Sequence, residues 1–396
     1  MISVNEAWNI IVRQLPVKKI TEVSLLESLD STLAEDVFSD LDLPPFDKSA
    51  MDGYALRAAD IKNAPVELEI IEVVSAGQVP VKAVKPGKTI KIMTGAPIPQ
   101  GADTVVRIED TEAVKNNTVR VLATIKKGAN IAYQAEELKE GAKVLSKDTF
   151  LRSQEIGVLA SVGKQRLKIY QKPTVAIIST GDELVEINVK PQPAQIRNSN
   201  SYTTAGQIAK MGLNYELLGI ARDNLSDLTE KISRGLQFDI LVLTGGVSVG
   251  EFDLVEQVLK KLGVKLFFDQ VAIKPGKPFV FGKKEDHLVF ALPGNPVSSF
   301  VITEVFIRPA VSMISGNPSL VKPKIFAKIT EPFQKITNRQ QYVPAVFEQQ
   351  TFSITPVHWH GSADLVSVTH ANALLIIPPN ITPLKQDDQA EVMLLE

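Results

Sequence analysis

The strongest constraint on the fold is a regular alternation of apolar runs and helical patterns between about Lys172 and Gly316. Runs typical of buried strands lie at 175–179, 215–220, 240–243 and 288–292, and helical periodicity lies between or after them at 202–211, 225–236, 254–262 and 297–314. Strands joined by crossover helices of this length form a parallel sheet with helices on both faces. We therefore predict a doubly wound, mainly parallel α/β domain over residues 172–317.

The flanking segments predict three further domains. Residues 43–137 carry many Pro and Gly residues among short apolar runs, which indicates an inserted, mostly-β domain. On either side, a capping-box spacing at Ser3 to Glu6 and a second helix start at Ser153 predict a mixed, discontinuous scaffold domain of 1–42 and 138–171. Alternating polar and apolar residues after Gly316 predict a small C-terminal β domain over 318–396.

Charge and cysteine content exclude several functions. The chain has 396 residues, and 43 Lys and Arg against 45 Asp and Glu give a net charge of −2, so no global field favours nucleic acid or an anionic membrane. The absence of cysteine excludes disulfides, thiolate metal sites and a cysteine nucleophile. No run of 18 apolar residues and no signal-peptide core are evident, so we expect a cytoplasmic protein without membrane or nucleic-acid partners.

Ligands of open α/β sheets bind beyond the carboxyl ends of the strands, so the loops at those ends are the candidate site. Four such loops stand out: Thr180-Gly181-Asp182-Glu183, the segment 244–253, Lys274-Pro275-Gly276-Lys277-Pro278, and Pro293-Gly294-Asn295-Pro296. In the second, Gly245, Gly246 and Gly250 would let backbone N–H groups reach an anion, beside the hydroxyls of Thr244 and Ser248. A phosphate cradle and a plain strand-to-helix turn remain equally compatible with that loop.

Charged residues in these loops add two hypotheses. Lys274 and Lys277 flank a Pro-Gly turn and would suit an oxyanion, although a solvated basic turn has the same composition. Carboxylates that could hold a divalent ion with phosphates are Asp182, Glu183, Asp223 and Asp253. Asp253, three residues before Glu256, equally suits a helix cap. His358 and His360 lack an evident third ligand and are interpreted as structural.

Two strings in the predicted β insert are less specific. The segment 44–55 is dense in turn formers, and 91–99 predicts a strand that runs into a turn, with Thr94 as a ligand donor or merely a hairpin end.

Seven strings together resemble one family. In chain order they are PPFDKSAMDGYA (44–55), KIMTGAPIP (91–99), STGDEL (179–184), TGGVSVGEFD (244–253), IKPGKP (273–278), LPGNPVS (292–298) and GSADL (361–365). Nearly the whole chain is similar to the molybdenum insertases, the molybdopterin molybdotransferases that include the gephyrin E domain.

The resemblance implies an activity: insertion of molybdate into adenylylated molybdopterin, with cleavage of the phosphoanhydride, release of AMP and a requirement for Mg²⁺. It implies catalytic roles for Asp52, Thr94, Glu183, Asp253, Lys274 and Lys277, with Glu183 and Asp253 as metal ligands. Substrate-binding roles are implied for Thr180, Gly181, Asp182, Asp223, Thr244, Gly245, Gly246, Ser248, Gly250, Pro293, Asn295 and Ser362. The sulfur that binds molybdenum then belongs to the cofactor's dithiolene.

The family also implies partners. It forms elongated homodimers whose site lies between the α/β domain of one subunit and the inserted domain of the other. An upstream adenylyltransferase and apo-molybdoenzymes are further expected partners.

Three departures from the family pattern leave alternatives open. Gln270 stands where relatives commonly carry a second lysine, Lys48 stands where asparagine is usual, and Glu137 follows Ala135-Glu136 in place of an arginine-led pattern. A neutral residue at 270 motivates a tungstate-preferring insertase. A non-catalytic pterin-binding scaffold and a pterin adenylyltransferase are the remaining alternatives, since fold alone does not settle function.

Overall fold

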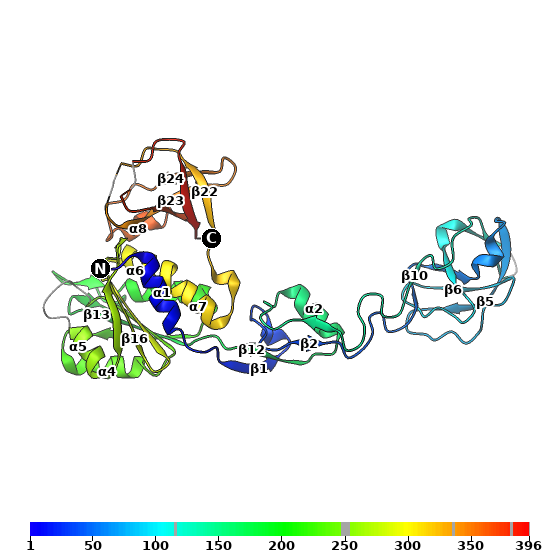
Figure 1. The fold of residues 1–396 in the computed structure, drawn as a ribbon, viewed down its shortest axis with the longest axis horizontal. Helices are drawn as coiled ribbons and strands as arrows, with labels where there is room; N and C mark the ends of the chain where they lie inside the picture. Colours follow the sequence, from blue (N-terminus) through cyan, green and yellow to red (C-terminus); the bar gives the residue numbers. More distant parts are fainter. Residues whose placement is uncertain (115–116, 247–253, 335–336, 381–382, 396) are drawn as a thin grey trace. The chain divides into compact units, whose positions relative to one another are not determined.

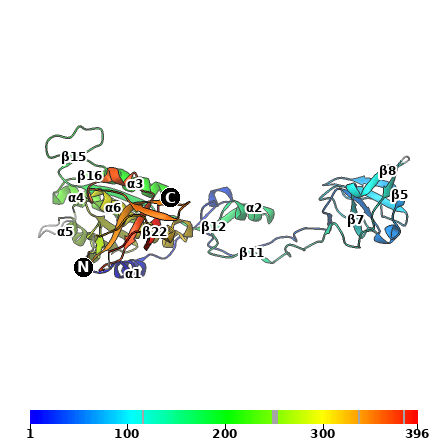
Figure 2. The same cartoon turned by 90° about the horizontal axis from the view of Figure 1, so that it is seen from above.

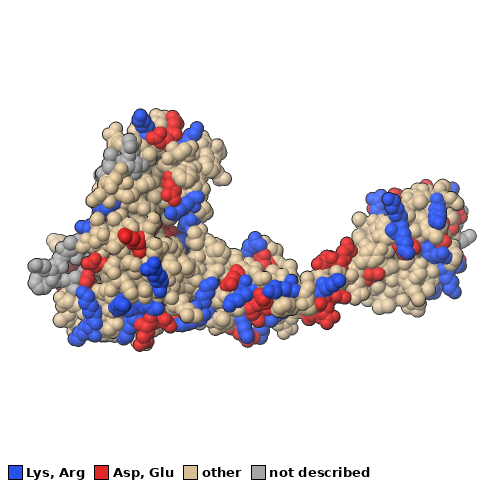
Figure 3. Space-filling model, viewed as in Figure 1, with Lys and Arg blue, Asp and Glu red and all other residues tan. Residues whose placement is uncertain are grey.

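The computed structural model describes residues 1–114, 117–246, 254–334, 337–380 and 383–395. The chain divides into two compact units. Unit 1 comprises Met1–Glu22, Asp30–Ala34 and Lys168–Glu396, and unit 2 comprises Val23–Leu29 and Glu35–Leu167. Lys and Arg are interspersed with Asp and Glu on the visible face of each unit (Figure 3), as the near-zero net charge leads one to expect.

A six-stranded sheet forms the centre of unit 1 (Figure 1). Its strand order is β16 (Tyr215–Ala221), β13 (Val175–Thr180), β17 (Ile240–Thr244), β21 (His287–Leu292), β20 (Pro278–Lys284) and β18 (Lys265–Gln270). The first four strands are parallel, which confirms the predicted mainly parallel sheet. The last two are antiparallel additions at one edge, which the sequence analysis did not predict.

Alternate residues of the central strands separate two cores. Val175 and Ile177 of β13 face one cluster of buried residues, whereas Ala176 and Ile178 face another. The first core is covered by α1 (Val4–Gln14), α3 (Asn200–Lys210), α6 (Pro296–Ile302), the π-helical turn η4 (Thr303–Ile307) and α7 (Arg308–Ser315). The second is covered by α4 (Leu225–Gly235) and α5 (Leu254–Lys261). Because both faces are covered, these strands are apolar throughout.

Helix α1 begins at the predicted capping box, in which the Ser3 hydroxyl accepts from Glu6 N and a Glu6 carboxylate oxygen accepts from Ser3 N. Its buried residues Val4, Ala7 and Ile11 belong to the first α/β core, although the predicted boundaries place residues 1–42 in the scaffold.

The predicted long helix at 297–314 spans α6, η4 and α7. By length and apolar content, Pro296–Ser315 could cross a membrane, but 78% of its most apolar window is buried within the protein. Burial to this extent is typical of a helix in the core of a protein.

The C-terminal part of unit 1 is a closed barrel, which confirms the predicted β domain. Its strands are β22 (Lys324–Ile329), β23 (Gln340–Glu348), β24 (Ser353–Pro356), β25 (Ala373–Ile377) and β26 (Gln389–Leu394), closed by pairing of β25 with β23. Short helical turns η5 (Pro318–Leu320) and α8 (Leu365–Val368) accompany it. Leu374 and Ile376 of the barrel extend the first α/β core, so the two domains share packing.

The loop at 274–278 does not follow a strand of the α/β sheet, as its composition led us to expect. The residues before it, Ile273–Lys274, form the short strand β19, which pairs with β23 of the barrel. Two small strands, β14 (Leu184–Val185) and β15 (Ile196–Arg197), pair with each other at the two ends of the loop 186–195, which projects beside β15 in Figure 2.

Unit 2 contains a second six-stranded sheet in the order β7 (Thr104–Arg107), β4 (Gly53–Leu56), β6 (Lys88–Ile92), β5 (Val66–Val74), β9 (Thr118–Val121) and β8 (Thr111–Val114). Buried clusters on its two faces include Leu68 and Val106 on one side and Ile90 and Ile92 on the other. The predicted mostly-β character is confirmed. Turns η2 (Ala58–Ile61) and η3 (Ile108–Asp110) complete this region.

The rest of unit 2 is built from α2 (Ser153–Ser161) and two strand pairs, β2 (Val37–Phe38) with β11 (Lys143–Leu145) and β3 (Lys48–Ser49) with β10 (Ile131–Ala132). The chain enters and leaves this unit through β1 (Ile20–Ser24) and β12 (Arg166–Tyr170), and the turn η1 (Leu26–Ser28) follows β1.

Candidate functional site

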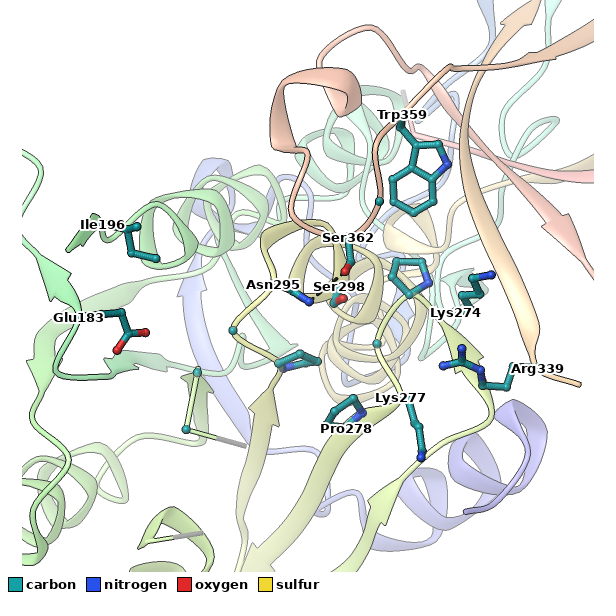
Figure 4. Close-up of a pocket in the computed structure, with 17 residues that line it drawn as sticks. Glu183, Ile196, Lys274, Lys277, Pro278, Asn295, Ser298, Arg339, Trp359 and Ser362 are labelled. Atoms are coloured by element: carbon teal, nitrogen blue, oxygen red, sulfur yellow. Dashed lines mark hydrogen bonds between the residues drawn. The ribbon is translucent and has the colours of Figure 1, made fainter. Parts of the chain in front are cut away.

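A pocket of about 790 Å³ lies in unit 1, where loops from the α/β sheet meet the barrel (Figure 4). Eight residues predicted as site residues line it: Glu183, Gly245, Gly246, Lys274, Lys277, Pro293, Asn295 and Ser362. All four candidate loops contribute. The position agrees with the expected binding edge of an open α/β sheet.

The glycines after β17 are required by close packing. Gly245 and Gly246 have φ of +88° and +66°, a region that favours glycine. A Cβ at Gly245 would lie 2.4 Å from the Thr180 carbonyl oxygen, and one at Gly246 would lie 2.3 Å from Thr180 Oγ1. The loop therefore passes directly over the end of β13, and its backbone forms part of the pocket wall.

Two predicted ligand hydroxyls lie below this wall. The Thr244 hydroxyl is within hydrogen-bond distance of Ser179 Oγ at 2.8 Å, and Ser179 Oγ also contacts Asn198 Oδ1 and Ser201 Oγ at 2.7 Å. All four residues are buried. Thr180 Oγ1 is also buried, without a hydrogen-bond partner. Neither Thr244 nor Thr180 is among the described residues that line the pocket, and the buried network instead fixes the strand ends beneath it.

The loop after β13 presents one carboxylate to the pocket. Glu183 lines the cavity, and its carboxylate lies so close to Gly181 (φ +144°) that a Cβ there would be 2.5 Å from Oε2. Asp182 Oδ1 instead accepts a hydrogen bond from Asp223 N, and Arg222 donates to the carbonyls of Asp182 and Leu184. Asp182 and Asp223 thus hold the loop that presents Glu183.

Three cationic side chains line the opposite end of the pocket. Lys274 and Lys277 flank the Pro-Gly turn, and Arg339 enters from the residue before β23 (Figure 4). The pairing of β19 with β23 places Ile273 opposite Gln340, and Arg339 Nη1 donates to the Ile273 carbonyl at 3.4 Å. The turn is tight because a Cβ at Gly276 would lie 2.9 Å from Ile302 Cδ1. The barrel strand pairing therefore brings Arg339 beside Lys274.

Hydrogen bonds attach the barrel loop 361–365 to the helix that begins after β21. Asn295 Nδ2 donates to Ser362 Oγ at 2.9 Å, and Val297 N donates to the Ser362 carbonyl at 3.0 Å. Asn295 occupies the N-cap of α6 and Pro296 its first turn, a position that suits proline because no backbone N–H is needed there. In the same barrel loop, Asp364 caps α8. Hydrogen bonds from Ser367 and His360 hold the pKa of the Asp364 carboxyl below its usual range.

Two predicted catalytic residues lie in unit 2 and contact each other. Thr94 N and Thr94 Oγ1 both donate to Asp52 Oδ1, at 2.7 and 2.8 Å. These hydrogen bonds, the backbone one first, lower the pKa of the Asp52 carboxyl from its ordinary value. Asp52 and Thr94 are thus held together within their own unit, with hydrogen bonds that favour the charged form of the Asp52 carboxyl. Ser248, Gly250 and Asp253, also predicted site residues, fall outside the described part of the chain.

Sequence reasoning missed Arg339 and Trp359, which both line the pocket. Arg339 lies in no glycine-rich string, although it immediately precedes an alternating strand. Trp359 lies between the two histidines and two residues before the start of the GSADL string, which was the available signal. His358 and His360 make an edge contact with each other, with ring centroids 5.6 Å apart.

The electrostatics of the pocket suit an anion. Among the described lining residues, three are cationic and Glu183 alone is acidic. No group of three or more His, Cys, Asp or Glu side chains that could hold a metal occurs among the described residues. Glu183 is therefore the described lining residue that could contribute to a cation site, and the remaining ligands would have to come from a bound substrate.

Comparison with known proteins gives a consistent result along the chain. Residues 2–163 match the family described as the MoeA N-terminal region (domain I and II), 176–313 a probable molybdopterin binding domain, and 327–395 the MoeA C-terminal region (domain IV). The chain is 34% identical over 402 residues to the molybdopterin molybdenumtransferase of Staphylococcus epidermidis, covering 100% of this chain and 96% of the relative. Identity to the Staphylococcus aureus protein of the same name is 32%, with the same coverage.

Solved structures extend the similarity to three dimensions. The molybdopterin biosynthesis MoeA protein of Pyrococcus horikoshii superposes with a TM-score of 0.85 at 30% identity, covering 100% of both chains. Another structure described as a molybdopterin biosynthesis MoeA protein from Pyrococcus horikoshii gives the same TM-score at 28% identity.

Proposed function

The chain belongs to the molybdopterin molybdenumtransferase (MoeA) family, and from this premise we propose that it inserts molybdenum from molybdate into molybdopterin at the pocket of unit 1. The protein is accordingly a transferase of molybdenum cofactor biosynthesis. This function accounts for a chain without cysteine, because the two sulfur ligands of the metal are supplied by the substrate's dithiolene.

The observation that carries the proposal is the presence of three cationic residues, Lys274, Lys277 and Arg339, in the lining of one end of the pocket. Molybdate is a dianion with four oxygens. Ammonium groups act as point charges toward such an ion, whereas a guanidinium can donate two parallel hydrogen bonds. Ser362, which already accepts from Asn295 Nδ2, has a hydroxyl proton to donate. These groups hold the oxyanion while the two thiols of the pterin replace two of its oxygens, which leave with the thiol protons as hydroxide.

The substrate in this proposal is adenylylated molybdopterin, and its phosphoanhydride is cleaved with release of AMP. Two features support a substrate larger than the oxyanion. The cavity of about 790 Å³ falls in the range of pockets that enclose drug-sized ligands. Gly245 and Gly246 leave a wall without side chains along which a phosphate could approach the backbone.

Mg²⁺ is proposed as the metal that this reaction requires. Glu183 fits this role as a single carboxylate ligand, since Mg²⁺ in phosphate sites is typically bound by one or two carboxylates together with substrate phosphates. Asp253 is a second proposed ligand. When bound, the ion would neutralise phosphate charge. Glu183 itself orients toward the pocket because the Asp182 and Arg222 hydrogen bonds fix its loop.

The remaining proposals concern the setting of the reaction. We propose that the protein works as a cytoplasmic homodimer, that an upstream adenylyltransferase supplies its substrate, and that apo-molybdoenzymes accept its product. The separation of Asp52 and Thr94 from Lys274 into different units supports a role for assembly in completing the site.

The decisive measurement is AMP release from adenylylated molybdopterin, with molybdate and Mg²⁺ present or omitted, for wild type and Lys274→Ala. We expect release that requires molybdate and falls at least tenfold in the variant at subsaturating molybdate, because a charged hydrogen bond to the oxyanion is lost. Arg13→Ala, at an exposed position on α1, is the matched control. Pterin binding without AMP release would contradict the transferase proposal and favour a scaffold.

The tungstate alternative depended on Gln270. In the structure this residue ends β18, where it pairs with Pro278, and it is not among the described lining residues of the pocket. We therefore propose molybdate as the oxyanion, and faster AMP release with tungstate than with molybdate would overturn that choice.

A further inference from the structure

The proposed oxyanion site leaves most of the pocket unexplained. The cationic residues occupy one end of a cavity of about 790 Å³, far larger than a tetrahedral oxyanion. The organic part of the substrate must therefore be held by other lining residues. Among the described ones, Gly245, Gly246 and Gly294 offer backbone, and Pro275, Pro278 and Pro293 offer small apolar surfaces.

Trp359 is the one aromatic side chain among the described lining residues. It comes from the barrel loop that also supplies Ser362, and Figure 4 shows its indole at the same end of the pocket as Lys274 and Arg339. The residue is packed against the first α/β core and is half-buried. A half-buried indole at a pocket wall has an apolar face available to a ligand.

We propose that Trp359 is the stacking surface for the pterin ring and that it sets the preference of this chain for a flat heteroaromatic substrate. The inference rests on the proposed function and deepens it, because it assigns a wall of the same pocket to a defined part of the substrate. Indole rings stack on flat heteroaromatic rings with favourable offset geometry, and the interaction tolerates different ring substituents.

The arrangement of the lining residues also sets the orientation of the substrate in the pocket. A ring held by Trp359 lies at the cationic end, where the dithiolene attached to it would meet the oxyanion bound by Lys274 and Arg339. The phosphate end of the substrate would then extend toward Glu183, which lies at the other end of the pocket (Figure 4), and toward Gly246, which packs against Thr180 at the start of the same loop. The pocket thus provides an aromatic and cationic end for the ring and metal, and a carboxylate and backbone end for the phosphates.

Simple packing is the competing explanation, and the chain offers a matched control for it. The sequence has two tryptophans, and Trp8 of α1 is likewise half-buried against the first α/β core but does not line the pocket. If Trp359 only packs, Trp359→Leu and Trp8→Leu should behave alike. If Trp359 stacks on the substrate, only its replacement should affect pterin binding.

The first experiment uses the full-length Trp8→Phe variant, in which Trp359 is the sole tryptophan, and neopterin as the probe, because neopterin has neither dithiolene nor phosphate. We expect saturable quenching of Trp359 emission, and unchanged emission of Trp8 in the Trp359→Phe variant. Absence of saturable quenching, or equal quenching of both tryptophans, would overturn the inference.

The second experiment measures AMP release as a function of adenylylated molybdopterin concentration. We expect the KM for the pterin substrate to rise about tenfold in Trp359→Leu and less than threefold in Trp359→Phe, with the KM for molybdate and the value of kcat retained in both. An unchanged pterin KM in Trp359→Leu, in an enzyme that still releases AMP, would refute the stacking role while leaving the proposed function intact. Conversely, quenching of Trp359 by neopterin in a protein that releases no AMP would refute the proposed transferase activity, while the role of Trp359 in binding the pterin would stand.

Discussion

Single residues decide the chemistry of the pocket, and Arg339 is the most informative of them. It lines the pocket beside Lys274 because β19 and β23 are paired. We expect Arg339→Ala to raise the KM for molybdate about 10- to 100-fold, since hydrogen bonds to charged groups contribute about 1.5–3 kcal/mol. Arg339→Lys should recover part of this loss because it restores the charge without the planar donor pair. Steady-state AMP release at varied molybdate measures both, and an unchanged molybdate KM in Arg339→Ala would remove Arg339 from the oxyanion site.

The backbone of the phosphate wall depends on Gly246. A Cβ there would lie 2.3 Å from Thr180 Oγ1 and 2.8 Å from Val255 Cγ2, at a φ of +66°. We expect Gly246→Ala to lower the free energy of unfolding by about 2 kcal/mol or more, from overpacking and backbone strain together. Gly263→Ala is the control, because its φ is +84° but a Cβ there would lie 4.0 Å from its nearest neighbour, Lys284 Cε. Equal destabilisation of the two variants in urea titrations would mean that close packing at 246 is unimportant.

Among the residues that line the pocket, those in glycine- and proline-rich loops could be predicted from the sequence, and those outside such loops were missed. Glu183, Lys274 and Asn295 were found because turn residues mark the ends of strands. Arg339 has no such marker, since only the pairing of two distant strands, 66 residues apart, brings it to the pocket. Thr244 was expected to face a ligand because hydroxyls often do, but the side chain of a residue at a strand end can equally point inward, as it does here.

Among the elements, the long core helix contains a buried ion pair that should be costly to break. Arg308 donates to both carboxylate oxygens of Glu304, at 2.6 and 2.9 Å, and both side chains are 5% exposed or less. Gln207 also donates to Glu304. Arg308→Met leaves a buried carboxylate without its cation, and we expect a loss of about 3–5 kcal/mol.

The matched comparison for this pair is the exposed pair Glu256 and Lys260 of α5, which has the same spacing. Lys260→Met should cost no more than about 0.5 kcal/mol. The double variant Glu304→Gln with Arg308→Met should be more stable than Arg308→Met alone, because no unpaired charge then remains. Urea unfolding of all four proteins tests this, and a double variant less stable than Arg308→Met would show that burial of the carboxylate is not the cause.

An ion pair at the start of helix α2 should make the stability of unit 2 depend on pH. Arg152 donates two side-chain hydrogen bonds to Glu155, at 2.6 and 3.1 Å, and these lower the pKa of Glu155 from 4.5 to about 2. Because the folded-state pKa is depressed, the stabilisation is complete above about pH 4.5 and is lost as the pH falls through about 2.

The experiment compares the thermal stability of wild type and Glu155→Gln from about pH 7 to pH 2. Wild type should be the more stable at neutral pH, and the difference should shrink below about pH 4.5. Glu67→Gln, at an exposed position in the same unit, should show no such trend. A difference between wild type and Glu155→Gln that is constant over the range would contradict the depressed pKa.

The elements show why the parallel part of the sheet was predictable and its edge was not. Strands β13, β17 and β21 are bounded by helices and turn residues, so their apolar runs stand out. Strands β18 and β20 are joined without a helix, and both carry phenylalanines that contact across the pair, such as Phe268 and Phe281. A short apolar run without a following helix has no periodicity that distinguishes an antiparallel edge strand from a loop.

In the whole molecule, the residues proposed for one reaction are divided between two units. Lys274 and Trp359 lie in unit 1, whereas Asp52 and Thr94 form their own hydrogen-bonded pair in unit 2. The sequence order of the motifs predicts this division, whereas the expectation that two subunits share a site came only from the resemblance to the family. In a homodimer with sites shared between subunits, each site would need unit 1 of one subunit and unit 2 of the other.

This proposal predicts complementation between inactive variants. Asp52→Ala and Lys274→Ala should each release little AMP as pure dimers. When the two chains are co-expressed with different affinity tags and the mixed dimer is purified, one of its two sites carries both substitutions and the other carries none. The mixed dimer should therefore recover about half of the wild-type activity per dimer. If each site is instead built within one chain, every site in the mixed dimer retains one substitution, and activity should stay at the level of the single variants. A mixed dimer that is purified intact but inactive would thus refute the shared site, whereas failure of the two chains to co-purify would refute the homodimer itself.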